Sequence, residues 1–350
     1  MFAKKIKVHQ QENAVSVCVP VFNSEPYLAA CLESVLNQTI LKTEKIQLIL
    51  VNDGSNGTDS SGLNCRQIFK SFLKQKKSFP YENNLNCIYL EHGKNKGLLE
   101  ARRTAVTNAD SLYTFILDSD DLLVPECLEK LFNEARTFQA DIVHGKADFF
   151  YSGAEREKVL SEKEKALTKR ISLVNENCLF NSETEKSIFN DWLFLQNHNG
   201  FLWGKLIKTS VYKDALEFIP PVFCTMAEDI LQYFFIALTA SSYKGINEIV
   251  YSYCADTGIS SEKKITSLYE WEKVCSTSSV FTVLFDFLNN CRNNDFAKKT
   301  AGVVSRICAS YCRSNIVQLE QCVAPEIKDE AYSILCSFWG KELIEKLKSL

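Results

Sequence analysis

The sequence lacks an excess of positive charge, a long apolar run and a secretory leader pattern. Each absence argues against one class of protein: nucleic-acid-binding, membrane-spanning and secreted, respectively. Lys and Arg total 40 against 43 for Asp and Glu, so the net charge is −3 and no nucleic-acid partner is expected. The most apolar stretch, Ile230–Ala240, is shorter than the roughly 20 residues that cross a bilayer, which leaves only surface attachment to a membrane open. No apolar core follows the charged start Met1–Lys7. We therefore expect a cytoplasmic protein, free or at the inner face of the membrane.

Cysteines are numerous, at 14, but they form no Cys-x-x-Cys pair and no cluster with histidine at zinc-binding spacing. Without a secretory signal, this dispersion predicts reduced thiols that behave as small buried apolar residues. Cys308 and Cys312 are four positions apart, which favours packing on one helix face over a ligand pair. His92, His144 and His198 are isolated; His198 is predicted to lie in a loop, with a metal-ligand role left open.

Strand and helix patterns alternate over the first 150 residues. Strands are predicted at Val15–Val21, Ile46–Val51, Cys87–Leu90, Tyr113–Leu117 and Ile142–His144. Helices are predicted over residues 24–38, 62–75 and 98–108, and after Pro125. Ser24 is predicted to cap the first helix, with Pro26 in its first turn. Alternation with continuously apolar strands is typical of a mostly parallel sheet covered by helices on both faces, which is an α/β fold.

The segment 151–190 interrupts this alternation, and Glu155–Arg170 has the composition of a solvated helix or an insertion. A helix is predicted over Ala227–Thr239 and a strand over Ile249–Tyr253; from about Ser260 the pattern is helical throughout. We expect the boundaries to give three parts: residues 1–150, residues 151–260 and a C-terminal helical region over residues 261–350. The helical region carries no catalytic signal and is predicted to organise an acceptor or a dimer contact.

Polar residues gather where the predicted strands end. Asn23-Ser24-Glu25 follows the first strand, Asn52-Asp53-Gly54-Ser55 the second, and Asp118-Ser119-Asp120-Asp121 the strand that ends at Leu117. In parallel sheets, ligands bind beyond the carboxyl ends of the strands. Turn formation alone explains Gly54 and Ser55, but it explains the acidic cluster less well.

The acidic cluster predicts a site for a hard divalent cation. Alternate carboxylates, from Asp118 and Asp120, offer the oxygen ligands that Mg²⁺ or Mn²⁺ takes, and such a cation would neutralise a diphosphate. For Asp121 alone, capping of the helix after Pro125 is the expected role.

Several segments in register resemble the family-2 glycosyltransferases, which have the GT-A fold. The segments are Val17-Cys18-Val19-Pro20-Val21-Phe22-Asn23, Leu50-Val51-Asn52-Asp53-Gly54-Ser55, Asn95-Lys96-Gly97 with Ala101-Arg102, Phe115 to Asp121, Trp203-Gly204-Lys205-Leu206, Ala227-Glu228-Asp229, and Ile249 to Tyr253 with Ser260. The resemblance covers about residues 14–262. It implies a Rossmann-like GT-A sheet, mixed and mostly parallel. Residues 1–150 would be its nucleotide-sugar half and residues 151–260 its acceptor-binding and catalytic half.

The resemblance also implies roles for individual residues. It places a nucleotide, usually a uracil nucleotide, against Pro20, Phe22, Glu25, Asp53, Lys96, Arg102 and Asp118. It assigns a metal ion, Mn²⁺ or Mg²⁺, to Asp120 and Asp118, and the general base to Asp229. Glu228 and Trp203 would lie near the donor or acceptor sugar, although Trp203 also suits a core position. The alternative for Glu228 and Asp229 is a purely structural role, because acidic residues are favoured in the first turn of a helix by its dipole.

The implied reaction is an inverting transfer of a sugar from a nucleotide-sugar, expected to be a UDP-sugar, to an acceptor hydroxyl on a glycan, glycolipid or glycoprotein. A carboxylate would take the hydroxyl proton while the metal stabilises the leaving diphosphate. A glycan or lipid-linked acceptor, peripheral membrane association and a homodimer are compatible with this reading. The alternatives are a nucleotidyltransferase, whose glycine-rich basic loop is missing after Val21, and a catalytically degenerate sugar-binding or scaffold protein.

Two positions depart from the family pattern. Ala227 stands where the family often has glycine, and Cys254 stands where it has a basic residue after Tyr253. Lys263 or Lys264 would be a substitute for the missing cation, but a solvated face is the plainer expectation for both. These departures affect the expected binding of the diphosphate more than the expected fold.

Overall fold

A computed structural model describes residues 13–151, 169, 171–172, 174–176, 183–184, 187–255, 257 and 264–349. Nearly all of the predicted insertion Glu155–Arg170 lies outside the described residues, as do Cys178, Ser260 and Lys263. The cysteines within the described part are all free, as predicted.

The first half of the chain forms a parallel sheet. Its strands are β1 (Asn13–Val21), β2 (Ile46–Asn52), β3 (Leu85–Glu91) and β4 (Ser111–Ile116), in the spatial order β3-β2-β1-β4. Helices α1 (Glu25–Leu36) and α2 (Cys65–Lys76) cover one face, and α3 (Leu98–Thr107) covers the other. Side chains of β1 alternate between these faces: Val17 and Val19 pack with α1, whereas Cys18 packs with α3. Both faces are therefore buried, which explains why the strands are continuously apolar.

The second half extends the sheet with both strand directions. β8 (Lys205–Lys208) lies antiparallel between β4 and β6 (Ile142–Phe150), and β9 (Tyr243–Cys254) runs parallel to β6. Within the described residues, the short strands β5 (Leu122–Leu123) and β7 (Glu183–Thr184) complete a nine-stranded sheet by pairing with β9. The predicted mixed α/β fold is thus confirmed, although β9 begins six residues before the predicted strand.

Further helices described in this part are α4 (Cys127–Phe138), α6 (Ile188–Leu193), α7 (Thr209–Glu217) and α8 (Glu228–Thr239), with single 3-10 turns at η1 (Thr39–Lys42) and η2 (Glu82–Asn84). Ser24 occupies the N-cap position of α1, as predicted, but its Oγ makes no capping hydrogen bond and lies 2.6 Å from Ser119 Oγ instead. Pro26 is in the first turn, as predicted.

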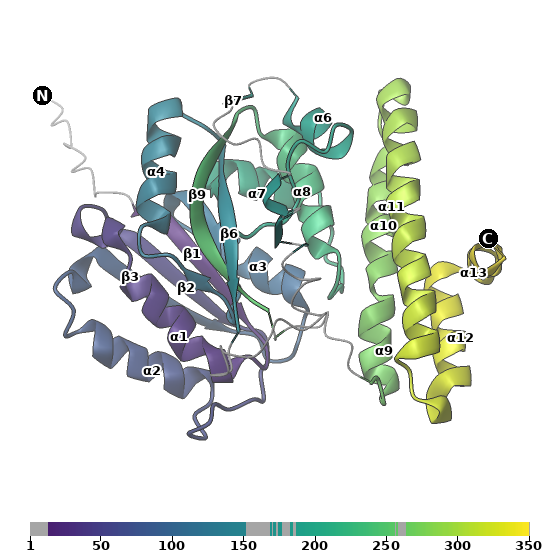
Figure 1. Ribbon diagram of the computed structural model, residues 1–350, viewed down its shortest axis with the longest axis horizontal. Helices are drawn as coiled ribbons and strands as arrows, with labels where there is room; N and C mark the ends of the chain where they lie inside the picture. The colour runs from purple at the N-terminus through teal and green to yellow at the C-terminus, as the bar shows by residue number, and fades with distance from the viewer. Residues whose placement is uncertain are drawn as a thin grey trace, which may run out of the picture.

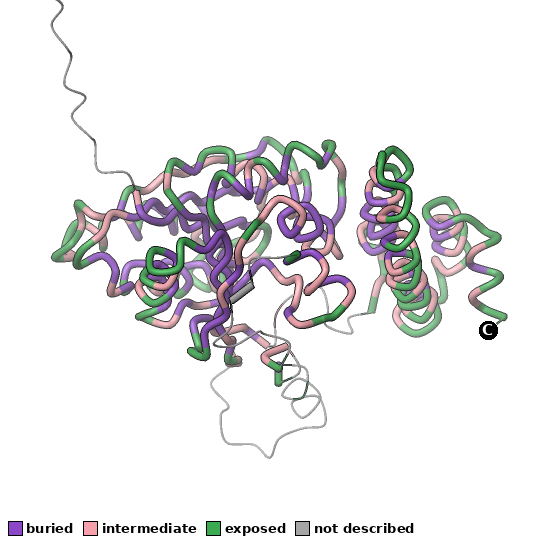
Figure 2. Tube along the Cα trace, turned by 90° about the horizontal axis from the view of Figure 1, so that it is seen from above, coloured by how far each residue is buried: buried purple, intermediate pink, exposed green. Residues whose placement is uncertain are grey.

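The C-terminal helices form a separate layer beside the sheet (Figure 1). They are α9 (Leu268–Cys275), α10 (Thr277–Asn289), α11 (Asn294–Gln321), η3 (Pro325–Ile327), α12 (Lys328–Trp339) and α13 (Lys341–Lys348). The ring of Phe287 on α10 packs edge-on against Phe235 of α8 at 5.0 Å between centroids, so one apolar core continues from the sheet into the helical layer. Figure 2 shows the buried residues concentrated in the sheet and the exposed ones on the outer turns of these helices. Among the described helices, none is long and apolar enough to cross a membrane.

Candidate active site

A cleft of about 370 Å³ opens at the carboxyl ends of β1, β2 and β4. Nine of the residues predicted for the site line it: Pro20, Phe22, Asp53, Arg102, Asp118, Asp120, Trp203, Glu228 and Asp229. They come from segments more than 200 positions apart, which the parallel connections bring to one edge of the sheet. Two predicted residues are not part of its lining. Glu25 is fully buried behind Gly57, and the side chain of Lys96 is exposed outside the cleft.

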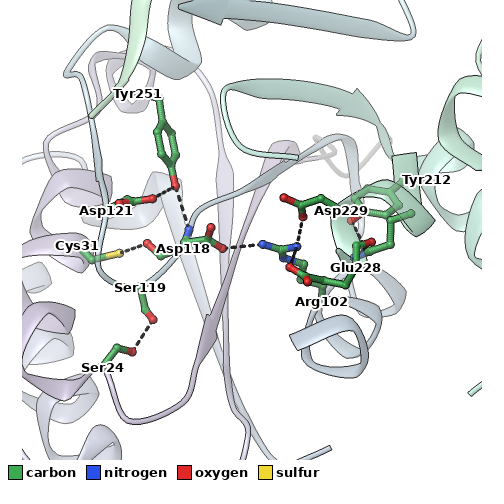
Figure 3. Close-up of polar contacts among 11 residues, drawn as sticks. Ser24, Cys31, Arg102, Asp118, Ser119, Asp121, Tyr212, Glu228, Asp229 and Tyr251 are labelled. Carbon is green, nitrogen blue, oxygen red and sulfur yellow. Dashed lines mark hydrogen bonds and ion pairs between the residues drawn. The ribbon is translucent and has the colours of Figure 1, made fainter. Parts of the chain in front are cut away.

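The guanidinium of Arg102 joins the two sides of the cleft (Figure 3). Its Nη2 donates to Asp118 Oδ1 at 2.9 Å, and its Nη1 donates to Glu228 Oε1 at 3.2 Å and to Asp229. The side chain of Arg102 is only 1% exposed, whereas those of Asp118 and Asp229 are 24% and 19% exposed toward the cleft. Arg102 lines the cleft as predicted, but its charge is already engaged by three carboxylates.

Two of the carboxylates that contact Arg102, those of Glu228 and Asp229, hold their protons more strongly than usual. Burial raises the pKa of Glu228, and the neighbouring Asp229 raises it further; Arg102 lowers it in part. Burial likewise raises the pKa of Asp229 above its ordinary value, while Arg102 opposes the shift. One guanidinium therefore does not balance the three carboxylates. A carboxylate with a raised pKa at the wall of a cleft is suited to accept a proton from a bound hydroxyl.

The acidic loop after β4 is fixed by contacts from three directions. The Tyr251 hydroxyl donates to Asp121 Oδ2 at 2.6 Å and accepts from the backbone N–H of Asp118 at 3.2 Å. The backbone N–H of Cys254 donates to Asp121 Oδ1 at 2.7 Å. The predicted capping role of Asp121 is wrong, because α4 has Glu126 at its N-cap and Asp121 is buried against β9. Asp121 instead holds the loop so that Asp118 and Asp120 face the cleft.

Asp118 and Asp120 fit a divalent cation. Burial, and to a lesser extent the nearby Asp118, raises the pKa of Asp120. One carboxylate oxygen of Asp118, Oδ1, accepts a hydrogen bond from Arg102, and the second oxygen remains available to a ligand. Among the described residues, no three His, Cys, Asp or Glu side chains are grouped as a ready-made metal site. Two carboxylates plus substrate phosphates are a ligand set that Mg²⁺ commonly uses, so a diphosphate would complete this one.

The carboxylate of Asp53 organises the loop before α3. Its Oδ1 accepts from Lys96 N at 2.9 Å and lies 2.6 Å from His92 Nδ1, and its Oδ2 accepts from Gly97 N at 2.9 Å and Asn95 Nδ2 at 3.0 Å. These four contacts occupy all the acceptor positions of a carboxylate. Asp53 lines the cleft, but with these positions filled its carboxylate has no free acceptor for a hydrogen bond donated by a nucleotide base. Gly97 has φ +93°, and a Cβ there would lie 3.0 Å from Cys224 O, so this turn needs glycine.

Stacked aromatic rings form one wall of the cleft. The Trp203 ring lies 5.0 Å from Phe201 and 5.4 Å from Tyr251, at interplanar angles of 13° and 18°. Trp203 is 6% exposed and lines the cleft, so it is both a packed residue and a surface for a ligand. His198, by contrast, is buried in the core, stacked on Tyr243 at 4.5 Å, where burial lowers its pKa to about 3.

Sequence reasoning missed three residues of the site. His92, which reads as isolated, bridges Asp53 and Thr104, with Nε2 2.9 Å from Thr104 Oγ1. Thr225 and Lys273 also line the cleft, and the Thr225 hydroxyl donates to the backbone carbonyl of Lys273 at 2.8 Å. Lys273 belongs to α9, in the region predicted to carry no catalytic residue. None of the three residues belongs to a segment that carries the family resemblance, so no local signal identifies them.

Known proteins share both the sequence pattern and the fold. The model of glycosyl transferase family 2 matches residues 16–214. Glycosyltransferase GlyA of Streptococcus pneumoniae is 29% identical over 206 residues, which are 58% of this chain and 25% of GlyA. Poly(ribitol-phosphate) beta-N-acetylglucosaminyltransferase TarP of Staphylococcus aureus is 32% identical over 149 residues, which are 43% of this chain and 41% of TarP. The chain thus matches less than half the length of these relatives.

A solved structure matches nearly the whole chain. Residues 1–349 of S. aureus TarS, in complex with UDP-GlcNAc, align with a TM-score of 0.52 at 17% identity, covering 96% of this chain and 92% of that one. At this identity the likeness is one of fold, and it includes the C-terminal helices.

Proposed function

Because this chain belongs to glycosyl transferase family 2, we propose that it transfers a sugar from a UDP-sugar to a hydroxyl group of a glycan or lipid-linked acceptor, with inversion at the anomeric carbon. The observation that carries the proposal is the placement of Asp118 and Asp229 on either side of Arg102 in one cleft. A nucleotide-binding carboxylate and a second, proton-accepting carboxylate must be held a fixed distance apart for such a transfer, and one rigid guanidinium does this.

Asp229 is the proposed general base. It is 19% exposed to the cleft, and Arg102 fixes the orientation of its carboxylate. As Asp229 takes the hydroxyl proton, the acceptor oxygen bonds to the anomeric carbon and the bond to the nucleoside diphosphate breaks. Proton transfer of this kind contributes about 10²–10⁴-fold in rate. Glu228 is 9% exposed and shares Arg102, so we assign it to positioning Asp229.

On the opposite side, Asp118 and Asp120 would hold Mn²⁺ or Mg²⁺, which supplies neutralisation of the diphosphate charge when it is bound. Pro20 and Phe22, at the end of β1, would line the nucleotide base, and Trp203 would contact a sugar ring. The proposal includes a cytoplasmic location. There the protein would contact the inner face of the membrane through a lipid-linked acceptor.

The relatives suggest which substrates to try first. TarS is described in complex with UDP-GlcNAc, and TarP is named for transfer of N-acetylglucosamine to poly(ribitol-phosphate). We therefore propose UDP-GlcNAc as the first donor and a polyol-phosphate glycopolymer as the first acceptor. UDP-glucose is the second donor, because another relative is named poly(ribitol-phosphate) beta-glucosyltransferase.

The test is UDP release with product analysis. Protein, Mn²⁺, each donor and poly(ribitol-phosphate) are incubated, and UDP and the anomeric configuration of the product are measured. Asp229→Asn should lower the rate by about 10²–10⁴-fold and leave UDP affinity within about threefold, because the amide cannot take the proton. Asp214→Asn, at an exposed aspartate of α7 outside the cleft, is the matched control and should act like the unmodified protein. Failure of the unmodified protein to bind any nucleoside diphosphate would refute the proposal.

A further inference from the structure

The cleft contains many carboxylates and few cations. Among the described residues that line it, six are acidic: Asp53, Asp118, Asp120, Asp121, Glu228 and Asp229. The lining cations are Arg102 and Lys273. Arg102 is ion-paired to three of the carboxylates and is 1% exposed, so it has little charge to offer a further anion. A diphosphate entering this cleft therefore needs another cation besides a metal ion.

Lys273 reaches the cleft from the C-terminal helices. Its ammonium lies 4.8 Å from the centroid of the Phe22 ring, at the end of β1, and 4.4 Å from that of Tyr269, one turn earlier on α9. No carboxylate of the described residues is within salt-bridge distance of it. Two aromatic rings thus orient the side chain while its ammonium protons stay available, since a cation–π contact uses no hydrogen-bond acceptor.

The backbone around Lys273 is held as firmly as its side chain. Its carbonyl oxygen accepts from Thr225 Oγ1 at 2.8 Å and from Ser276 Oγ at 2.5 Å. Thr225 lies two residues before the turn that starts α8, the helix that carries Glu228 and Asp229. The position of Lys273 is therefore tied both to β1, through Phe22, and to the segment that carries the proposed base.

We propose that Lys273 binds a phosphate oxygen of the donor nucleotide, so that the C-terminal helical region forms part of the donor site. The inference rests on the proposed function. A lysine ammonium is a compact charge that suits a phosphate oxygen, and here it enters the cleft from α9, beside Phe22. The C-terminal helices then contribute to donor binding. A protein truncated before α9 would lose this contact with the donor as well as the packing of the helices on the sheet.

Binding of UDP and of uridine separates a phosphate contact from a base contact. Affinities are measured in Mn²⁺, by titration calorimetry for UDP and by competition against labelled UDP for uridine. Lys273→Met removes the charge and keeps the length of the side chain. We expect it to weaken UDP binding about tenfold and to change uridine binding by less than twofold. Lys273→Arg should bind UDP within threefold of the unmodified protein, because the charge is kept.

Lys299→Met is the matched control. Lys299 also lies over an aromatic ring, that of Phe194 at 4.1 Å, and also belongs to the C-terminal helices, but it does not line the cleft. It should leave both affinities unchanged. Equal UDP binding by Lys273→Met and the unmodified protein would overturn the inference while the proposed function stands. Equal losses for UDP and uridine, or failure of Lys273→Arg to restore UDP binding, would assign Lys273 to packing and overturn it too. Absence of UDP binding by the unmodified protein would remove the proposed function itself.

Discussion

Replacement of Arg102 by methionine tests the electrostatic design of the site most directly. Arg102→Met keeps an unbranched apolar stem at a 1% exposed position and removes the guanidinium and its charge. Three carboxylates, with side-chain exposures of 24%, 9% and 19%, would then face one another without a cation. Removal of one partner from a buried ion pair typically costs about 3–5 kcal/mol. We expect a loss of that size in the free energy of unfolding at pH 8.

The loss should depend on pH in a defined direction. A carboxyl group whose pKa is raised by folding binds more protons in the folded state, so its contribution to stability falls as the pH rises. The pKa values of Glu228 and Asp229 are already raised with Arg102 present, and they will rise further without it. At pH 5.5, protons replace part of the missing charge. Each pKa unit corresponds to about 1.4 kcal/mol, so the deficit should shrink to about 1–2 kcal/mol.

Urea unfolding followed by tryptophan fluorescence measures these free energies at pH 5.5 and pH 8.0. Glu228→Gln in the Arg102→Met background should recover about 1–2 kcal/mol at pH 8, because it removes the cost of protonating or charging the buried Glu228 carboxyl group. Arg136→Met is the control: its ion pair with Glu44 is exposed, and its loss should cost under about 1 kcal/mol at either pH. A deficit that is equal at both pH values, and that Glu228→Gln does not reduce, would refute the reasoning.

Four further outcomes follow from the geometry. The transfer rate should fall at acidic pH with a midpoint above 3.8, the ordinary pKa of aspartate, because burial raises the pKa of Asp229. A pH profile of UDP release measures this midpoint, and a value at or below 3.8 would contradict the prediction. Asp53→Asn should lower the free energy of unfolding by about 1–3 kcal/mol, since it turns one of two accepting oxygens into a donor that faces two other donors; an unchanged urea midpoint would count against this. Ala227→Gly should raise stability by about 0.5–1 kcal/mol in the same assay, because Ala227 has φ +62°, where a Cβ is strained; a loss of stability would show that the strain is absent. Asp120→Asn should weaken UDP binding in Mn²⁺ but not in EDTA, and calorimetry with equal losses in both buffers would argue against a metal ligand.

Periodicity was sufficient to predict the α/β part of the fold. The apolar runs of β1, β2 and β4 are buried on both faces, so their composition carries the signal of a covered sheet without any tertiary information. The ends of these strands were equally readable. Because parallel strands share an edge, the polar residues after each of them had to meet, and the cleft contains Phe22, Asp53 and Asp118 together.

Capping and hydrogen-bond partners were less predictable. Ser24 has the right residue type and position for an N-cap, yet its hydroxyl pairs with Ser119, which is 95 positions away. Asp121 precedes a helix, yet it accepts from Tyr251 and Cys254 of β9. In both cases the local preference is worth about 1 kcal/mol, which a long-range partner of similar strength can replace.

At Ala227, the sequence and the structure each give part of the explanation. The sequence shows that alanine replaces the glycine common in the family. The structure shows why glycine would be favourable there, because the backbone is left-handed with φ +62°. The loop around Asp53 is similar: the sequence suggests an acceptor for a ligand, and the fold fills that acceptor with His92, the Asn95 side chain and the backbone N–H groups of Lys96 and Gly97.

Residue order alone specified the strands, the helices and the edge of the sheet at which chemistry gathers, because these follow from side-chain period and from the direction of neighbouring strands. The packed chain was needed to engage Arg102 with carboxylates up to 127 positions away and to bring Lys273 of α9 over Phe22, which follows the first strand. Such contacts depend on how distant helices dock on the sheet, and docking is set by the shape of the whole core, which no short stretch of residues encodes.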